Sequence, residues 1–126
     1  MKVYNYQFAT ATVLNTNINF APLEINQLYG YAIQAVITGT PTGVFKLQCS
    51  ADPNSHNSAN GAYSGAATAP TNWTDIASSS FTVTASGTCA WNVTSGMYNW
   101  VRMVYTDSSS GSSTATVAAT FNGKGV

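Results

Sequence analysis

The residues able to carry acid–base chemistry are few and scattered along the chain. There are four carboxylates, Glu24, Asp52, Asp75 and Asp107, and a single histidine, His56. The carboxylates are not paired in the sequence and each lies beside turn residues, so solvated loop acids are a better interpretation than a two-carboxylate hydrolase. The histidine lies in a polar loop, which orients a catalytic base poorly. We therefore expect no enzyme and no catalytic residues.

The sequence carries no signature of a metal or cofactor site. One histidine and two cysteines do not make a zinc site by themselves, and there is no phosphate-binding loop or dinucleotide fingerprint. The cysteines, Cys49 and Cys89, fall on faces that we expect to point inward. Two alternatives stay open for them: reduced thiols in the core, which suit a cytoplasmic product, or a disulfide between two sandwich strands. A disulfide requires Cα atoms within about 7 Å of each other.

One basic residue lies in an unexpected place, the middle of the aromatic stretch "GMYNWVRMVYT". Alternation of side chains along a strand puts Tyr98, Trp100, Arg102 and Val104 on one face, with the guanidinium able to lie over Trp100 or Tyr98 as a cation–π pair. Three interpretations stay open. Trp100 is a cross-strand packing residue and Arg102 pairs with a nearby acid; or the face is a protein interface, since Trp, Tyr and Arg dominate such hot spots; or Tyr98, Trp100 and Trp73 stack on sugar rings.

These residues must be positioned by β-strands, because apolar residues recur at every second position through most of the chain. The turns between the runs are short and polar, there is no convincing helical stripe, and "LEINQLYGY" is at most a turn or two of helix. We predict one all-β domain over residues 1–126, a single antiparallel β-sandwich of the jelly-roll or immunoglobulin-like type with seven to eight strands. The expected inward positions are Tyr31, Ile33, Ala35, Ile37; Phe45, Leu47, Cys49; Phe81, Val83; Cys89, Trp91, Val93; Val101, Met103, Tyr105; and Ala115, Val117, Ala119, Phe121.

Two segments stand apart from these short strands. Residues 1–20 contain two expected strands, Lys2–Phe8 and Thr10–Ile18. They form a candidate arm, because chain ends become ordered when a partner holds them. Residues 50–72 are mostly small and polar, and loops beyond about 12–15 residues are uncommon and often functional. We expect this long loop to reach a neighbour or a ligand.

The charge content excludes several classes of partner. Charged residues make up 6% of the 126 residues and the net charge is zero, against about 25% charged residues in an average soluble protein. The four basic residues do not cluster, so we expect no nucleic acid and no anionic membrane surface as partner. No apolar run is long enough to span a membrane, and the N-terminus lacks the apolar core of a signal peptide, so we expect synthesis in a cytoplasm. Zero net charge suits a protein packed in an assembly better than a free monomer.

Three phrases of the sequence resemble a known family: "GVFKLQCSADP", "PTNWTDI" and "WNVTSGMYNWVRMVYTDSSSGSSTATVAATFNGKG". The family is that of small β-sandwich virion structural proteins of tailed bacteriophages and prophages, and the resemblance runs from about residue 31 to residue 125. It implies a capsid decoration or head or tail accessory protein, made in the host bacterial cytoplasm and present in the virion as a homo-oligomer or in many copies in an assembly. Its implied partners are the major capsid protein or other virion proteins.

We therefore predict a non-enzymatic virion structural protein that binds and stabilises the particle. The residues expected at its interface are Tyr98, Trp100, Arg102 and Trp73. The alternative is a carbohydrate- or receptor-binding module on a phage tail or head fibre, with the same aromatic residues as a stacking platform.

Overall fold

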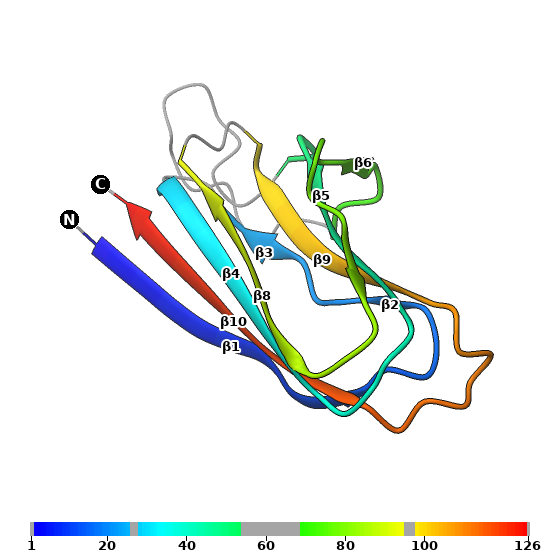
Figure 1. Cartoon of the computed structure of the whole chain (residues 1–126). Helices are drawn as coiled ribbons and strands as arrows, with labels where there is room; N and C mark the ends of the chain where they lie inside the picture. Colours follow the sequence, from blue (N-terminus) through cyan, green and yellow to red (C-terminus); the bar gives the residue numbers. More distant parts are fainter. Residues whose placement is uncertain (1, 26–27, 54–68, 95–97, 126) are drawn as a thin grey trace.

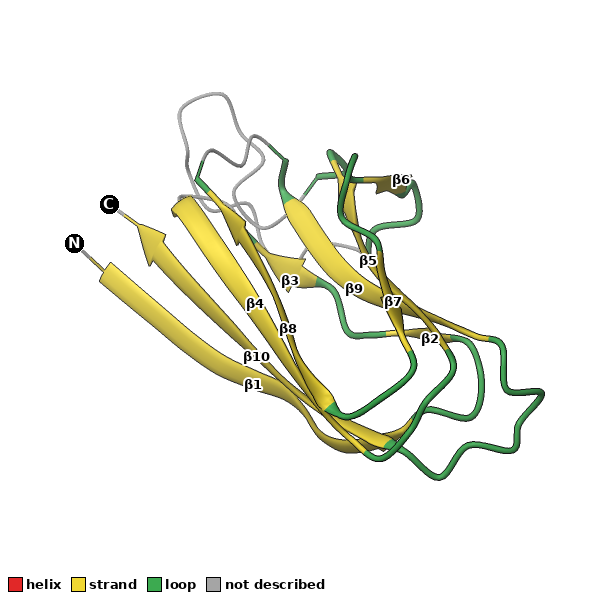
Figure 2. Ribbon diagram, in the orientation of Figure 1, coloured by secondary structure: helices red, strands yellow, loops and turns green. Residues whose placement is uncertain are grey.

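The computed structural model describes residues 2–25, 28–53, 69–94 and 98–125. This part of the chain holds ten strands and no helix (Figures 1 and 2). Figure 1 shows two layers of strands, with the start of β1 and the end of β10 side by side. The strands are β1 (Lys2–Val13), β2 (Ile18–Asn19), β3 (Leu23–Glu24), β4 (Leu28–Thr38), β5 (Gly43–Ser50), β6 (Thr74–Asp75), β7 (Phe81–Val83), β8 (Gly87–Val93), β9 (Trp100–Asp107) and β10 (Thr116–Gly125).

The strands form two antiparallel sheets. The first sheet has the order β1-β10-β4-β8, and the second has the order β2-β9-β5-β6, with β3 also pairing with β9 and β7 also pairing with β5. β2 and β3 both pair with β9, and β6 and β7 both pair with β5. We therefore count β2 with β3 as one interrupted strand, and β6 with β7 as another. Counted this way, there are eight strands, four in each sheet, and their order is that of a jelly roll. The structure thus confirms the predicted antiparallel sandwich. Of the two predicted types, jelly roll and immunoglobulin-like, it is a jelly roll.

A proline causes the first interruption. Between β2 and β3 the chain still follows β9, because the Phe20 N–H donates to the Met103 carbonyl oxygen at 3.0 Å. Pro22 has no N–H to continue the ladder. The pairing resumes when Leu23 aligns with Val101, one residue later than a regular strand would place it. The edge of the second sheet is therefore broken at this point.

A buried serine bridges the second interruption, between β6 and β7. The Ser79 hydroxyl accepts a hydrogen bond from the Leu47 N–H of β5 at 3.1 Å and donates to the Ile76 carbonyl oxygen at 2.6 Å. Its own carbonyl oxygen accepts the indole N–H of Trp91 at 2.6 Å. The side chain thus replaces the strand partner that β5 lacks here, and nothing in the sequence pattern singled it out.

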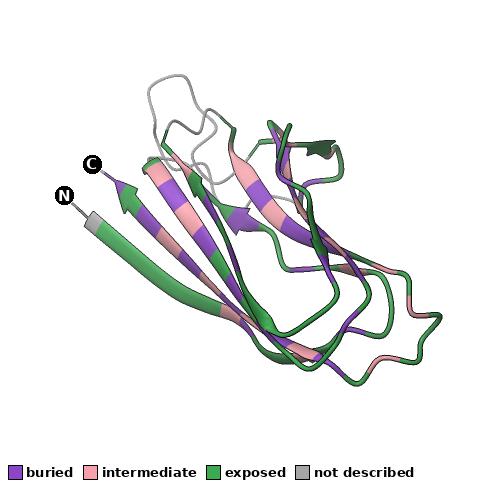
Figure 3. Cartoon of the chain, in the orientation of Figure 1, coloured by how far each residue is buried: buried purple, intermediate pink, exposed green. Residues whose placement is uncertain are grey.

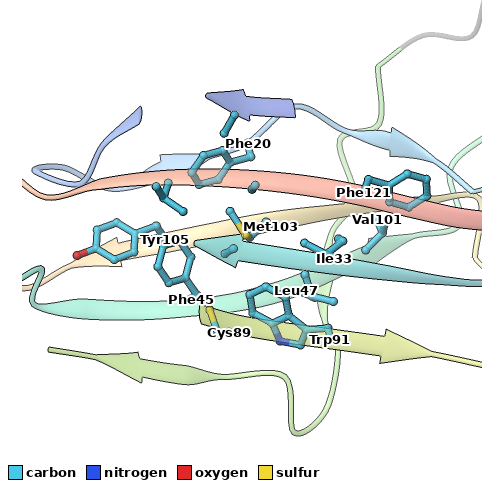
Figure 4. Packing of buried hydrophobic residues seen from close by; sticks show 14 of the residues in the cluster. Phe20, Ile33, Phe45, Leu47, Cys89, Trp91, Val101, Met103, Tyr105 and Phe121 are labelled. Carbon is cyan, nitrogen blue, oxygen red and sulfur yellow. The ribbon is translucent and has the colours of Figure 1, made fainter. Parts of the chain in front are cut away.

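The core lies between the sheets, where the side chains of both layers meet (Figure 4). Nearly all of the predicted inward positions are buried, as the alternating bands in Figure 3 show. Val93 is only partly buried, and Phe81 is 39% exposed. The Phe81 ring packs edge-on against Trp91, with 5.3 Å between the ring centroids, at the rim of the core. Phe81 therefore lies on the inward face as predicted, opposite Phe45, but it is only half covered because β7 is a short edge strand.

The N-terminal segment is one strand, where the sequence predicted two. β1 pairs with β10 along its length, with register shifts between Gln7 and Ala9 and between Ala9 and Thr12. A bulge changes which face a side chain occupies without ending the strand, which explains the apparent break in the pattern. Only the second half of β1 reaches the core, where the Phe8 ring packs edge-on against Phe20 at 6.0 Å. The segment "LEINQLYGY", the one candidate for a turn or two of helix, holds β3 and the start of β4 in the described part of the chain.

Candidate functional site

The outward face of the second sheet brings together side chains from three strands. In the register of this sheet, Gln48 of β5 lies between Arg102 of β9 and Asp75 of β6. Lys46 lies two residues earlier on β5 and therefore on the same face. Trp73 directly precedes β6. We call these five residues the Trp73–Arg102 cluster.

Arg102 is held by two contacts within this cluster. Its guanidinium carbon lies 4.2 Å from the centroid of the Trp73 ring, a cation–π geometry. Its Nε and Nη2 atoms both donate to the side-chain oxygen of Gln48, at 2.9 and 2.7 Å. Partial burial lowers the pKa of Arg102 from its ordinary value, because the charged form loses some of its water. The ring under the guanidinium is Trp73, a partner that alternation along β9 did not predict.

The cluster continues from Gln48 to an ion pair. The Gln48 amide nitrogen donates to one Asp75 oxygen at 2.7 Å, and Lys46 lies 2.9 Å from the other. These hydrogen bonds, that of Gln48 first and that of Lys46 second, lower the pKa of the Asp75 carboxyl. Arg102 is thus linked to an acid through the Gln48 amide, whereas the sequence suggested a direct pair. The glutamine was missed as a site residue, although alternation along β5 already placed it outward.

The base of the long loop packs beside this cluster. The Asp52 carboxylate accepts the backbone N–H groups of Thr71 and Asn72, at 2.7 and 2.9 Å, and so ties the two ends of the loop together. The indole N–H of Trp100 points at the carbonyl oxygens of Asp52 and Pro53, at 3.2 and 3.4 Å. Trp100 therefore supports the loop base. The loop itself, predicted over residues 50–72, includes residues 54–68, which with His56 lie outside the described residues.

Tyr98 does not continue the face of Trp100 and Arg102. It precedes β9, where strand alternation no longer fixes its direction, and it is 46% exposed. A hydrogen bond with its side chain lowers the pKa of the Cys49 thiol, while burial, the larger influence, raises that pKa. Of the four predicted interface residues, the structure thus brings Trp73 and Arg102 into direct contact, places Trp100 on the same strand face, and directs Tyr98 toward an inward cysteine.

Both cysteines are free and buried. Cys49 lies on β5 in the second sheet, and Cys89 lies on β8 in the first. Facing sheets are about 10 Å apart, which is beyond the Cα separation that a disulfide spans. Burial raises the pKa of both thiols, because the thiolate loses its water. Of the two open alternatives, the structure has the reduced core thiols.

Each aspartate on the described part of the chain has a structural contact. Asp52 closes the loop base and Asp75 pairs with Lys46. Asp107 accepts hydrogen bonds from the hydroxyl and backbone N–H of Ser109, at 2.6 and 3.0 Å, in the turn after β9. The pKa of all three carboxyls is lowered, chiefly by hydrogen bonds to Asn72, Gln48 and Ser109 respectively. These aspartates are therefore ionised at neutral pH and poorly suited to act as general acids.

Two further findings concern the described residues. No group of three or more His, Cys, Asp or Glu side chains among them is arranged to hold a metal ion. In that same part of the chain, no helix is long and apolar enough to cross a membrane.

Comparisons with known proteins define the fold. No protein-family model matches the chain, and no curated protein sequence matches it. The structure is similar to that of the SPBc2 prophage-derived protein YomS, with a TM-score of 0.55 and 12% identity over 97% of this chain and 92% of that one. It also aligns with a chain of the infectious bursal disease virus Gx strain, with a TM-score of 0.49 and 10% identity over 96% of this chain and 31% of that one. The second similarity is too low to support an inference, and the first shows a shared fold.

Proposed function

We propose that this chain is a non-enzymatic structural protein of a bacteriophage virion, of the capsid decoration or head accessory type. The observation that carries the proposal is the similarity of fold to a prophage-derived protein along nearly the whole chain. The sequence segments that resemble virion structural proteins support the same proposal. In this proposal the protein is made in the host cytoplasm and becomes part of the particle.

Protein–protein contact is the mechanism that the outward face supports. The Trp73–Arg102 cluster presents the Trp73 ring and Arg102, and its other two charged residues, Lys46 and Asp75, are already paired with each other. Its side chains are already held in place by hydrogen bonds, so binding a neighbour costs little side-chain ordering. The partner in this proposal is the major capsid protein or another virion protein.

The structural contacts of the aspartates make them poor candidates for a general acid. A general acid needs a pKa near the working pH, and the pKa shifts of Asp52, Asp75 and Asp107 all go the other way. The carbohydrate-binding alternative has less support on the outward face. Arg102 covers one face of the Trp73 ring, and the indole N–H of Trp100 is directed at the loop base instead of outward.

The test is the composition of purified particles. Particles of the phage that encodes this chain are purified by density gradient, and mass spectrometry measures the ratio of the chain to the major capsid protein. We expect a fixed ratio that survives further purification, and density for a jelly roll on the particle surface in cryo-electron microscopy. Absence of the chain from the particles would overturn the proposal. So would glycan binding that is lost in Trp100→Ala while the particle content stays unchanged, since this result identifies a carbohydrate-binding module.

A further inference from the structure

The edge strand β1 is unusually exposed to solvent for the edge of a sheet. Among the described residues it pairs with β10 alone, so its other edge is free. From Val3 to Gln7 every residue is exposed, which means that both faces of the strand are uncovered (Figure 3). Val3, Tyr4 and Tyr6 are 62%, 44% and 56% exposed. A long and partly aromatic edge, without charged residues from Val3 to Val13, is a template for pairing with another strand.

The other sheet contrasts with this edge. Both of its edges are interrupted strands, β2 with β3 and β6 with β7, and none of these four segments exceeds three residues. Short and broken edges are a common device against unwanted pairing. β1 has 12 residues and is regularly paired from Lys2 to Gln7, before its first bulge. The segment of β1 from Lys2 to Gln7 therefore lacks the interruptions that protect the edges of the second sheet from pairing.

We propose that β1 pairs with β1 of a second copy of this chain, antiparallel about a twofold axis at Asn5. In that register Tyr4 lies opposite Tyr6 of the partner subunit and Val3 lies opposite Gln7 of the partner subunit. The two residue numbers in each pair differ by an even number. Residues separated by an even number of positions on a strand point to the same face, so the paired side chains lie on one face of the combined sheet. The two four-stranded sheets then become one continuous sheet of eight strands.

The composition of the strand favours a second copy as the occupant. Val3 to Val13 contains no charged residue, so two copies meet without like-charge repulsion, and a charged partner strand would find no counter-charge there. The aromatic pairs across the axis are cross-strand pairs of a stabilising type. A twofold pairing also closes on itself as a dimer, whereas pairing of β1 with another edge of the sheet would produce larger rings or open filaments.

The size of the contact predicts a weak dimer. A tyrosine buries on the order of 200 Å², so the exposed fractions of Tyr4 and Tyr6 leave roughly 100 Å² each to be covered. Four tyrosines in a dimer then contribute roughly 400 Å², against about 1,200–2,000 Å² for a stable interface. The dimer should form at high concentration and gain strength where many copies are held on one assembly. In that respect the inference rests on the proposed function, which supplies such an assembly.

The test uses the full chain with a single added cysteine. In the proposed register the two copies of residue 5 lie directly opposite, with Cα atoms about 4.5–5.5 Å apart, which is within disulfide range. Under mild oxidation Asn5→Cys should form a covalent dimer at least tenfold faster than Val3→Cys, whose two copies lie far apart along the strands. Thr88→Cys, exposed on β8 in the same sheet, controls for random collision. The native cysteines are buried and should not interfere.

The unmodified chain gives a second and independent measurement. Sedimentation equilibrium should show the mass rising toward twice that of the monomer as the concentration approaches about 1 mM, the weak end of specific association. The pairing is refuted if the mass stays that of the monomer and Asn5→Cys crosslinks no faster than Thr88→Cys. Fastest crosslinking at a position outside Val3–Gln7 would also refute it. These measurements use isolated protein. A negative result would therefore refute the pairing of β1 but not the proposed function, which is tested separately by the composition of the particles.

Discussion

Replacing Arg102 by alanine tests whether the outward cluster is part of the fold or only a surface for a partner. The change removes two hydrogen bonds to Gln48 and the cation that lies over Trp73. Gln48 keeps its hydrogen bond to Asp75 and is not left without a partner. We expect the isolated domain to fold and to lose stability.

The magnitude follows from the exposure of these contacts. Hydrogen bonds to a charged group contribute about 1.5–3 kcal/mol when well shielded, and a cation–π contact contributes about 0.5–1 kcal/mol at an exposed site. Arg102 is only partly buried, so we expect a total loss of about 1–2 kcal/mol. At about 2.1 cal/mol/K per residue, a chain of 126 residues loses about 4 °C in melting temperature for each kcal/mol. The expected decrease is therefore about 4–8 °C.

The assay is thermal and urea unfolding followed by circular dichroism. The single variants Arg102→Ala and Trp73→Ala and their double variant form a cycle, in which a coupling of about 0.5–1 kcal/mol isolates the cation–π contact. Lys124→Ala, at an exposed charge on the other sheet, should change stability by less than about 0.5 kcal/mol. The reasoning is refuted if Arg102→Ala melts like Lys124→Ala. If the same variant also fails to bind particles, Arg102 acts only as an interface anchor.

Three other measurements test further contacts of the structure. Ser79→Ala leaves a buried backbone N–H of β5 unpaired and should cost about 1–3 kcal/mol, whereas its exposed neighbour Ser80→Ala should cost almost nothing; equal stability of the two variants would contradict the role of the hydroxyl. Hydrogen bonds, chiefly from Asn72, lower the pKa of Asp52, so its stabilising contribution is present above the ordinary value of 3.8 and is lost as the pH falls below it. Unfolding measured against pH should show this acid-induced loss, with a shallower decline in Asp52→Asn. Both cysteines should react slowly with a thiol reagent in the native state and completely in urea, and rapid native reaction would show that they are not buried.

The core of the fold was predictable from the sequence because one face of each long strand is buried. Period-two alternation marks that face directly, and the inward residues of β4, β5, β9 and β10 are buried as predicted. The interruptions were not predictable in the same way. The role of Ser79 depends on a gap in the pairing of β5, which exists only when strands distant in the sequence are side by side.

The outward cluster was predictable in part for a similar reason. Alternation within β9 correctly placed Trp100 and Arg102 on one face. The partners of Arg102 come from β5 and from the residue before β6, and a long loop separates these two strands in the sequence. A side chain's neighbours across strands are set by register, which a single sequence does not display. Trp73 was predicted as an interface residue, but its contact with Arg102 was not.

The two surfaces argued to bind partners lie on different sheets. The Trp73–Arg102 cluster is on the outward face of the second sheet, and β1 is an edge of the first. Pairing through β1 extends the first sheet sideways and uses no residue of the cluster. Two copies joined in this way would therefore each keep a cluster available for a different partner. Consequently a cluster variant such as Arg102→Ala should leave the crosslinking of Asn5→Cys unchanged, whereas a single shared surface would couple the two.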